Sequence, residues 1–105
     1  MPITKPEVSV EHESVLLEAE KAVHGPRQRD YGHPLDNFVN TAMMWEAILG
    51  APVSAQQVGL CMIALKISRQ LNTPKRDNLV DIAGYAETLE MAIHEAKRRD
   101  GKELA

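Results

Sequence analysis

The sequence is poor in cysteine and in aromatic residues, and each shortage excludes a class of protein. Cys61 is the single cysteine among 105 residues, so neither a disulfide framework nor a cysteine-type zinc site can form within one chain. Aromatic residues make up only 4% of the chain. Any core must therefore be mainly aliphatic, which favours packed helices over a β-sandwich.

Long apolar runs and a strong positive charge are also lacking. No window approaches the roughly 18 apolar residues of a membrane span, and the N-terminal segment has no apolar signal core. The net charge of −3 disfavours the broadly basic surface of a nucleic-acid coat protein. We therefore expect a single cytoplasmic domain with no membrane partner and no extended nucleic-acid surface.

What is present is a hydrophobic pattern with helical steps of three and four residues. It predicts helices from about 9 to 24, from 34 to 49, from 54 to about 71, and from 73–77 to 100. Ser9 is a plausible N-cap of the first, and Ser54 with Gln57 forms a capping box before the third. No strand pattern is found. We assign residues 9–100 to one domain, with a flexible arm at 1–8 and a flexible tail at 101–105.

Four helices joined by short connections predict an all-α, antiparallel four-helix bundle. The third helix is apolar nearly all round from 58 to 67, so we expect it to be the most buried and to pair with the fourth. Because so small a bundle buries little surface, we also expect a homodimer or a higher homo-oligomer. Residues expected to be buried or in a subunit interface are Phe38, Trp45, Leu60, Ile63, Leu65, Ile67, Leu79, Ile82 and Leu89.

A cluster of charges brackets the turn between the third and fourth helices. Lys66 and Arg69 share one helix face, and Asp77 and Asp81 share another, so an antiparallel hairpin would place bases against acids. One interpretation is a salt-bridge network that locks the hairpin. The other is a ligand site, in which the bases bind phosphate and the aspartates bind Mg²⁺ through oxygen. The sequence leaves both open.

A second candidate is the glycine-bounded loop 25–33, which contains Arg27, Arg29 and Tyr31. The rigid fork of donors on arginine suits phosphate, and tyrosine can stack on a base. The loop could equally be a solvated connection. The histidines lack the spacing of a metal site.

Two segments resemble a known family. HGPRQRDYGHPLDNF and ALKISRQLNTPKRDNLVDIAGYAE are similar to small uncharacterised proteins of tailed bacteriophages and prophages, over residues 13–90. That family is similar in turn to the MazG-type all-α nucleoside-triphosphate pyrophosphohydrolases. The resemblance implies a helical oligomer in the bacterial cytoplasm that uses Mg²⁺ to split a nucleotide into its monophosphate and pyrophosphate.

The metal ligands of those enzymes carry over only in part. A Glu-x-x-Glu pair aligns with Lys66-x-x-Arg69, and a Glu-x-x-Asp pair aligns with Asn78-x-x-Asp81, so only Asp81 matches. One hypothesis is a Mg²⁺-dependent pyrophosphohydrolase with Asp77 and Asp81 as metal ligands. The alternative is a non-catalytic nucleotide- or phosphate-binding, or structural, accessory protein in which an ion-pair cluster replaces the metal. Either way, Arg27, Arg29, Tyr31, Lys66 and Arg69 are the predicted phosphate- or substrate-binding residues.

Overall fold

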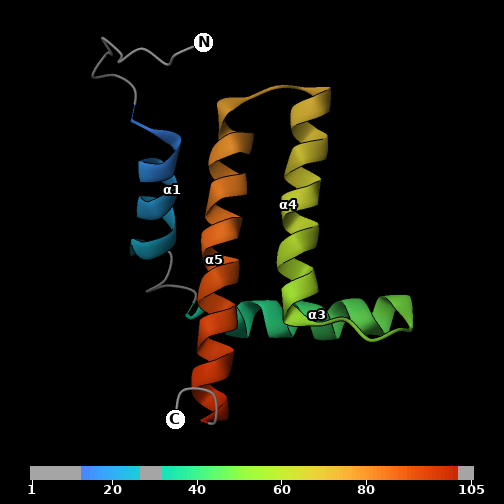
Figure 1. Ribbon diagram of the computed structural model, residues 1–105. Coiled ribbons are helices and arrows are strands. Elements are labelled where there is room, and N and C mark those ends of the chain that lie inside the picture. Colours follow the sequence, from blue (N-terminus) through green and yellow to red (C-terminus); the bar gives the residue numbers. More distant parts are fainter. Residues whose placement is uncertain (1–12, 27–31, 102–105) are drawn as a thin grey trace.

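The structure is a computed structural model that describes residues 13–26 and 32–101. This part of the chain is all-helical and contains no strand, which confirms the all-α part of the prediction. Its helices are α1 (Val15–His24), α3 (Pro34–Leu49), α4 (Ala55–Asn72) and α5 (Arg76–Asp100) (Figure 1). The arm at 1–8 and most of the tail lie outside the described residues.

The helix ends follow local sequence signals. The Ser54 hydroxyl accepts a hydrogen bond from the Gln57 backbone N–H at 3.0 Å, and the Gln57 side-chain Oε1 accepts one from the Ser54 N–H at 2.9 Å, so the predicted capping box is formed. Gly50 closes α3 in the left-handed conformation, with a φ of 70°. The first helix begins later than predicted. Its N-cap is Ser14, whose hydroxyl accepts from the Leu17 N–H at 3.0 Å, whereas Ser9 lies outside the described residues.

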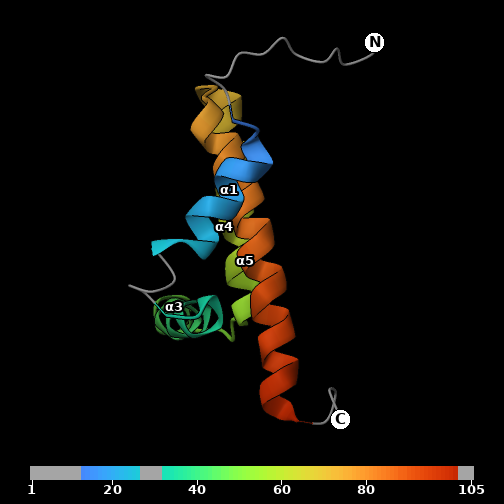
Figure 2. The same cartoon turned by 90° about the vertical axis from the view of Figure 1, so that its left-hand side faces the viewer.

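α5 is the central element. It contacts α1, α3 and α4, and α4 runs antiparallel beside it while α1 lies on another side (Figures 1 and 2). The predicted pairing of the third and fourth helices is therefore present as α4 and α5.

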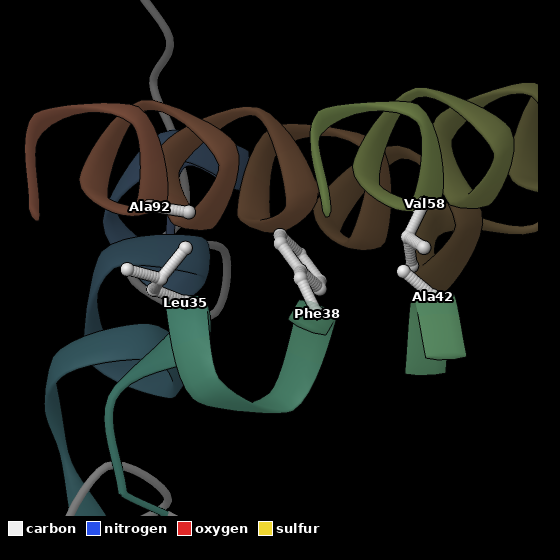
Figure 3. Close-up of a cluster of buried hydrophobic side chains, with 5 residues drawn as sticks. All are labelled: Leu35, Phe38, Ala42, Val58 and Ala92. Carbon is white, nitrogen blue, oxygen red and sulfur yellow. The ribbon is translucent and has the colours of Figure 1, made fainter. Parts of the chain in front are cut away.

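The arrangement of a four-helix up-and-down bundle is not confirmed, because α3 runs across α4 and α5 rather than alongside them (Figure 1). The buried stripe of α3 explains this. Leu35 and Phe38 point towards α5, near Ala92, whereas Ala42 meets Val58 of α4 (Figure 3). A helix whose single stripe contacts two neighbouring antiparallel helices in turn must cross both of them.

The core is small, and α4 approaches it closely at a glycine. A β-carbon on Gly59 would lie 3.0 Å from Leu89 Cδ1 and 3.3 Å from Phe38 Cε2. The absence of a side chain at Gly59 therefore allows α4 to contact both α3 and α5.

Within the single chain only some of the residues predicted to be buried or in a subunit interface are buried. Phe38 and Leu89 are buried as expected, and Trp45, Ile63 and Ile82 are half-buried. The exposed members of the predicted set are Leu60, Leu65, Ile67 and Leu79. α4 is not the most buried helix: its only buried residues are Val58 and Gly59. The reason is that its neighbours α3 and α5 cover only part of its circumference.

Candidate functional site

The turn between α4 and α5 places residues of α4 opposite residues of α5 that lie about the same number of positions from the turn. Lys66 Nζ lies 2.9 Å from Asp81 Oδ2 in an ion pair. Nearer the turn, Asn78 Nδ2 donates to Gln70 Oε1 at 3.1 Å and to the Thr73 carbonyl at 3.3 Å. Asn78 is the one buried polar residue among those described, and its amide locks the turn.

The predicted cluster of four charges forms as a single pair. Arg69 and Asp77 are exposed and make no ion pair with any residue in the described ranges. Helical geometry explains the difference: Lys66, Gln70, Asn78 and Asp81 lie on the faces that α4 and α5 present to each other, and a residue one position away points elsewhere.

The Lys66–Asp81 pair is covered mainly on the lysine side. The Lys66 side chain is 17% exposed and that of Asp81 is 43% exposed. Breaking a partly desolvated pair by removing one partner leaves the other charge uncompensated. The Asp81 carboxylate is therefore held in place by Lys66 and remains partly exposed.

Asp81 also lines a cavity of about 190 Å³ between α1, α3 and α5. Ala19, Ala22 and Val23 of α1 form one wall, and Gly32, Pro34, Asn37 and Phe38 form a second. The α5 wall consists of Val80, Asp81, Gly84, Tyr85 and Thr88. Apolar groups dominate and a few polar groups converge, which is the usual composition of a small-molecule site.

Of the residues on the α5 wall, only Asp81 was predicted from the sequence as a candidate site residue, although several of the others have the spacing of one helix face. Asp81, Gly84, Tyr85 and Thr88 follow one another at steps of three, one and three residues, so they share one face of α5. The contribution of α1 and of Asn37 has no such local signal, because both come from other helices.

Two ionic contacts hold α1 against α5 and thereby keep its wall in place. The Arg76 guanidinium pairs with the Glu18 carboxylate, and its Nη2 also donates to the Glu13 carbonyl at 2.6 Å. At the other end of α1, His24 Nε2 lies 2.8 Å from Glu87 Oε2. α1 contacts no other described helix, so these contacts and Val23 determine its position.

The residues at the aligned metal positions do not fit a Mg²⁺ site. Lys66 places a cation against Asp81, and the amide of Asn78 is engaged in the turn. In the described ranges no group of three or more His, Cys, Asp or Glu side chains is placed to hold a metal ion. Mg²⁺ is commonly bound through one or two carboxylates together with water and phosphate oxygens, and the carboxylate at these positions is instead paired with a cation.

Three of the predicted ligand-binding residues, Arg27, Arg29 and Tyr31, lie outside the described residues. The residue that follows them, Gly32, lines the cavity. No helix in the described part of the chain combines the length and the apolar character needed to cross a membrane.

The residues that form the cavity and the α4–α5 turn lie within the part of the chain that matches a protein-family model. The chain belongs to the domain of unknown function DUF6378, whose family model matches residues 14–93. It is similar to the Gene 55 protein of Mycobacterium phage D29, with 39% identity over 84 residues, covering 79% of this chain and 56% of that protein. The Gene 55 protein of Mycobacterium phage L5 is 40% identical over 88 residues, again covering 56% of its length.

These relatives confirm the predicted resemblance to phage proteins. The chain spans little more than half the length of each of them. No solved structure matches the chain.

Proposed function

We propose that this protein binds a nucleotide, with the base in the cavity between α1, α3 and α5. The observation that carries the proposal is Asp81, which lines a largely apolar cavity and whose carboxylate is paired with Lys66 at 2.9 Å. A carboxylate so placed accepts hydrogen bonds from the amino and imino N–H groups of a base. Lys66 offsets the cost of holding that charge beside apolar groups.

The residues that line the cavity suit a flat aromatic ring. Phe38 and Tyr85 contribute aromatic surface, and Gly84 leaves the α5 wall without a side chain at that position. Stacking on aromatic groups contributes about 1–3 kcal/mol per base. Thr88 adds a hydroxyl, which can both donate and accept.

The phosphates, on this proposal, bind outside the cavity. Arg27, Arg29 and Tyr31 immediately precede Gly32, and they retain the role predicted from the sequence. Arg69 is exposed on α4 and is free of ion pairs with described residues, so its guanidinium is available to an anion. Lys66 is committed to Asp81 and has a supporting role.

The second candidate is a MazG-like, Mg²⁺-dependent pyrophosphohydrolase. It is favoured by the resemblance over residues 13–90 and by Asp81, which occupies the position of one metal ligand. In that case Asp77 and Asp81 would hold the ion, and Asp81 would have to exchange Lys66 for the metal. The Lys66–Asp81 pair therefore favours binding without hydrolysis.

A screen of nucleotides distinguishes the binding protein from the pyrophosphohydrolase. Each nucleoside mono- and triphosphate would be tested with and without Mg²⁺. Binding would be measured by calorimetry and thermal shift, and pyrophosphate release would be measured in the same samples. We expect saturable binding of one base class without Mg²⁺ and no pyrophosphate. Pyrophosphate release that requires Mg²⁺ would establish the enzyme instead, and no response to any nucleotide would refute both proposals.

The role of the cavity is tested by substituting two aspartates of α5, one that lines the cavity and one that does not. Asp81→Asn should weaken binding about tenfold or more, because a hydrogen bond to a charged group contributes about 1.5–3 kcal/mol. Asp77→Asn is the matched control, since Asp77 is exposed and does not line the cavity. Equal effects of the two substitutions would exclude the cavity as the base site.

A further inference from the structure

The exposed residues of α3 and α4 between positions 39 and 71 are almost without charge. Among the exposed residues between positions 39 and 71, Arg69 alone is charged, although charged residues are 26% of the whole chain. The other two charged residues of this segment are engaged: Glu46 Oε2 accepts from the Val53 N–H at 2.8 Å, and Lys66 pairs with Asp81. Depletion of charge is a feature of the centre of protein interfaces.

The same segment contains most of the exposed large apolar side chains. Nine of the twelve in the described ranges belong to it, and we call them the α3–α4 apolar surface: Val39, Met43, Met44, Ile48, Leu49, Leu60, Leu65, Ile67 and Leu71. Extensive exposed apolar surface commonly marks a site of interaction with another protein.

Along α4 the exposed apolar residues form a regular seam. Leu60, Ala64, Ile67 and Leu71 follow at steps of four, three and four, which is the spacing of a helix that packs against another helix. The face of α4 that contacts α5 is a different one and includes Lys66 and Gln70. The seam is therefore an unpartnered helix-packing face.

We propose that a second copy of this chain covers the surface, with the two α4 helices antiparallel across a two-fold axis beside Ala64. A two-fold contact requires one patch that is complementary to itself, and an uncharged apolar seam satisfies this without like-charge repulsion. About the axis, Leu60 of one copy faces Ile67 of the partner subunit, because the two residues lie at nearly equal distances from Ala64.

The antiparallel direction follows from the position of α3. It crosses α4 near Val58, at the end of α4 away from the turn, so antiparallel α4 helices would bring the turn end of each copy beside the α3 of the other. Leu71, 83% exposed at the turn end of α4, would then approach the partner's α3. α3 extends beyond α4 on the side away from α5, where that contact falls (Figure 1). The α4–α5 hairpins of the two copies would together form a four-helix assembly. This inference does not depend on nucleotide binding.

The test uses light scattering and sedimentation of the full chain. We expect a mass of twice 11.7 kDa for the wild type. Leu60→Glu and Ile67→Lys should each give a monomer with unchanged helix content by circular dichroism, because both residues are about half exposed in the single chain. Leu71→Glu provides a further variant at a more exposed position. Leu16→Glu, 74% exposed on α1, is the matched control and should remain dimeric.

Mixing the two monomeric variants tests the register. The carboxylate introduced by Leu60→Glu would face the ammonium introduced by Ile67→Lys, while the second Leu60–Ile67 contact stays as in the wild type. A dimer should therefore form in the mixture only. A wild-type monomer at all concentrations, or a Leu60→Glu variant that stays dimeric, would refute the surface. A mixture that stays monomeric would refute the antiparallel arrangement.

Discussion

Arg99, near the end of α5, forms a bidentate ion pair with Asp36 in the first turn of α3. Its Nη1 and Nη2 lie 2.7 and 3.1 Å from the two carboxylate oxygens. Arg99 also donates from Nε to Glu95 Oε2 at 2.8 Å, and Arg98 donates to both oxygens of Glu95. This network joins the crossing helix α3 to the long helix α5.

The network predicts a loss of stability in acid. Hydrogen bonds from Arg98 and then Arg99 lower the pKa of Glu95 from 4.5 to about 2, and the hydrogen bond from Arg99 lowers the pKa of Asp36. A carboxyl group with a lower pKa in the folded state stabilises the fold above its unfolded pKa. This stabilisation should be lost as the pH falls from about 4.5 towards 2, in melting temperatures measured across that range. In Arg99→Gln the same acid-side decrease should be smaller, and an unchanged decrease would contradict the assignment.

Two glycines in helices should respond in opposite ways to alanine. Gly84→Ala places a methyl group 3.7 Å from Val23 Cγ2, an ordinary contact, and should stabilise α5 by about 0.5–1 kcal/mol. At Gly59 the same methyl group would crowd Leu89 and Phe38. Gly59→Ala should therefore be less stable than Gly84→Ala by about 1–3 kcal/mol in urea unfolding. Equal changes in stability for the two variants would show that the contact of Gly59 with Leu89 and Phe38 can accommodate a methyl group.

Gly84→Ala also bears on the candidate site. The added methyl group would occupy part of the cavity, so nucleotide binding should weaken while stability rises. Calorimetry on the same sample separates these effects, because a purely structural change would move both in the same direction.

Removal of the Asn78 amide should loosen the α4–α5 turn. Asn78→Ala deletes the bonds to Gln70 and to the Thr73 carbonyl, and we expect a cost of about 1–3 kcal/mol in urea unfolding. Asn72→Ala, at an exposed position on the same hairpin, is the control and should cost much less. Similar costs would mean that the turn does not depend on the buried amide.

Loss of Arg76 should free α1 more than the rest of the fold. Arg76→Gln removes the charge that pairs with Glu18 and weakens the bond to the Glu13 carbonyl. Because exposed ion pairs contribute only about 0–1 kcal/mol, global stability should change little. Hydrogen exchange measured by mass spectrometry should nevertheless accelerate in α1 and stay unchanged in α4. Uniform acceleration would indicate that α1 unfolds together with the core.

The sequence alone determined the all-helical class and most of the helix ends. Capping boxes, glycines at helix ends and prolines act within a few residues, so their effect can be read locally. Ser54 with Gln57 and Gly50 are examples. The first helix was placed too early because an apolar pattern and a serine near residue 9 were read as its start, whereas Ser14 is the cap.

Only the tertiary structure decided which residues meet. Lys66 and Asp81 pair while Arg69 and Asp77 do not, because the facing sides of α4 and α5 depend on how the two helices are rotated against each other. α3 crosses its neighbours because Leu35 and Ala42 find their partners on different helices. The cavity exists because α1, α3 and α5 converge there from distant parts of the chain. Such relationships are determined by the packing of the whole molecule, and no local pattern contains them.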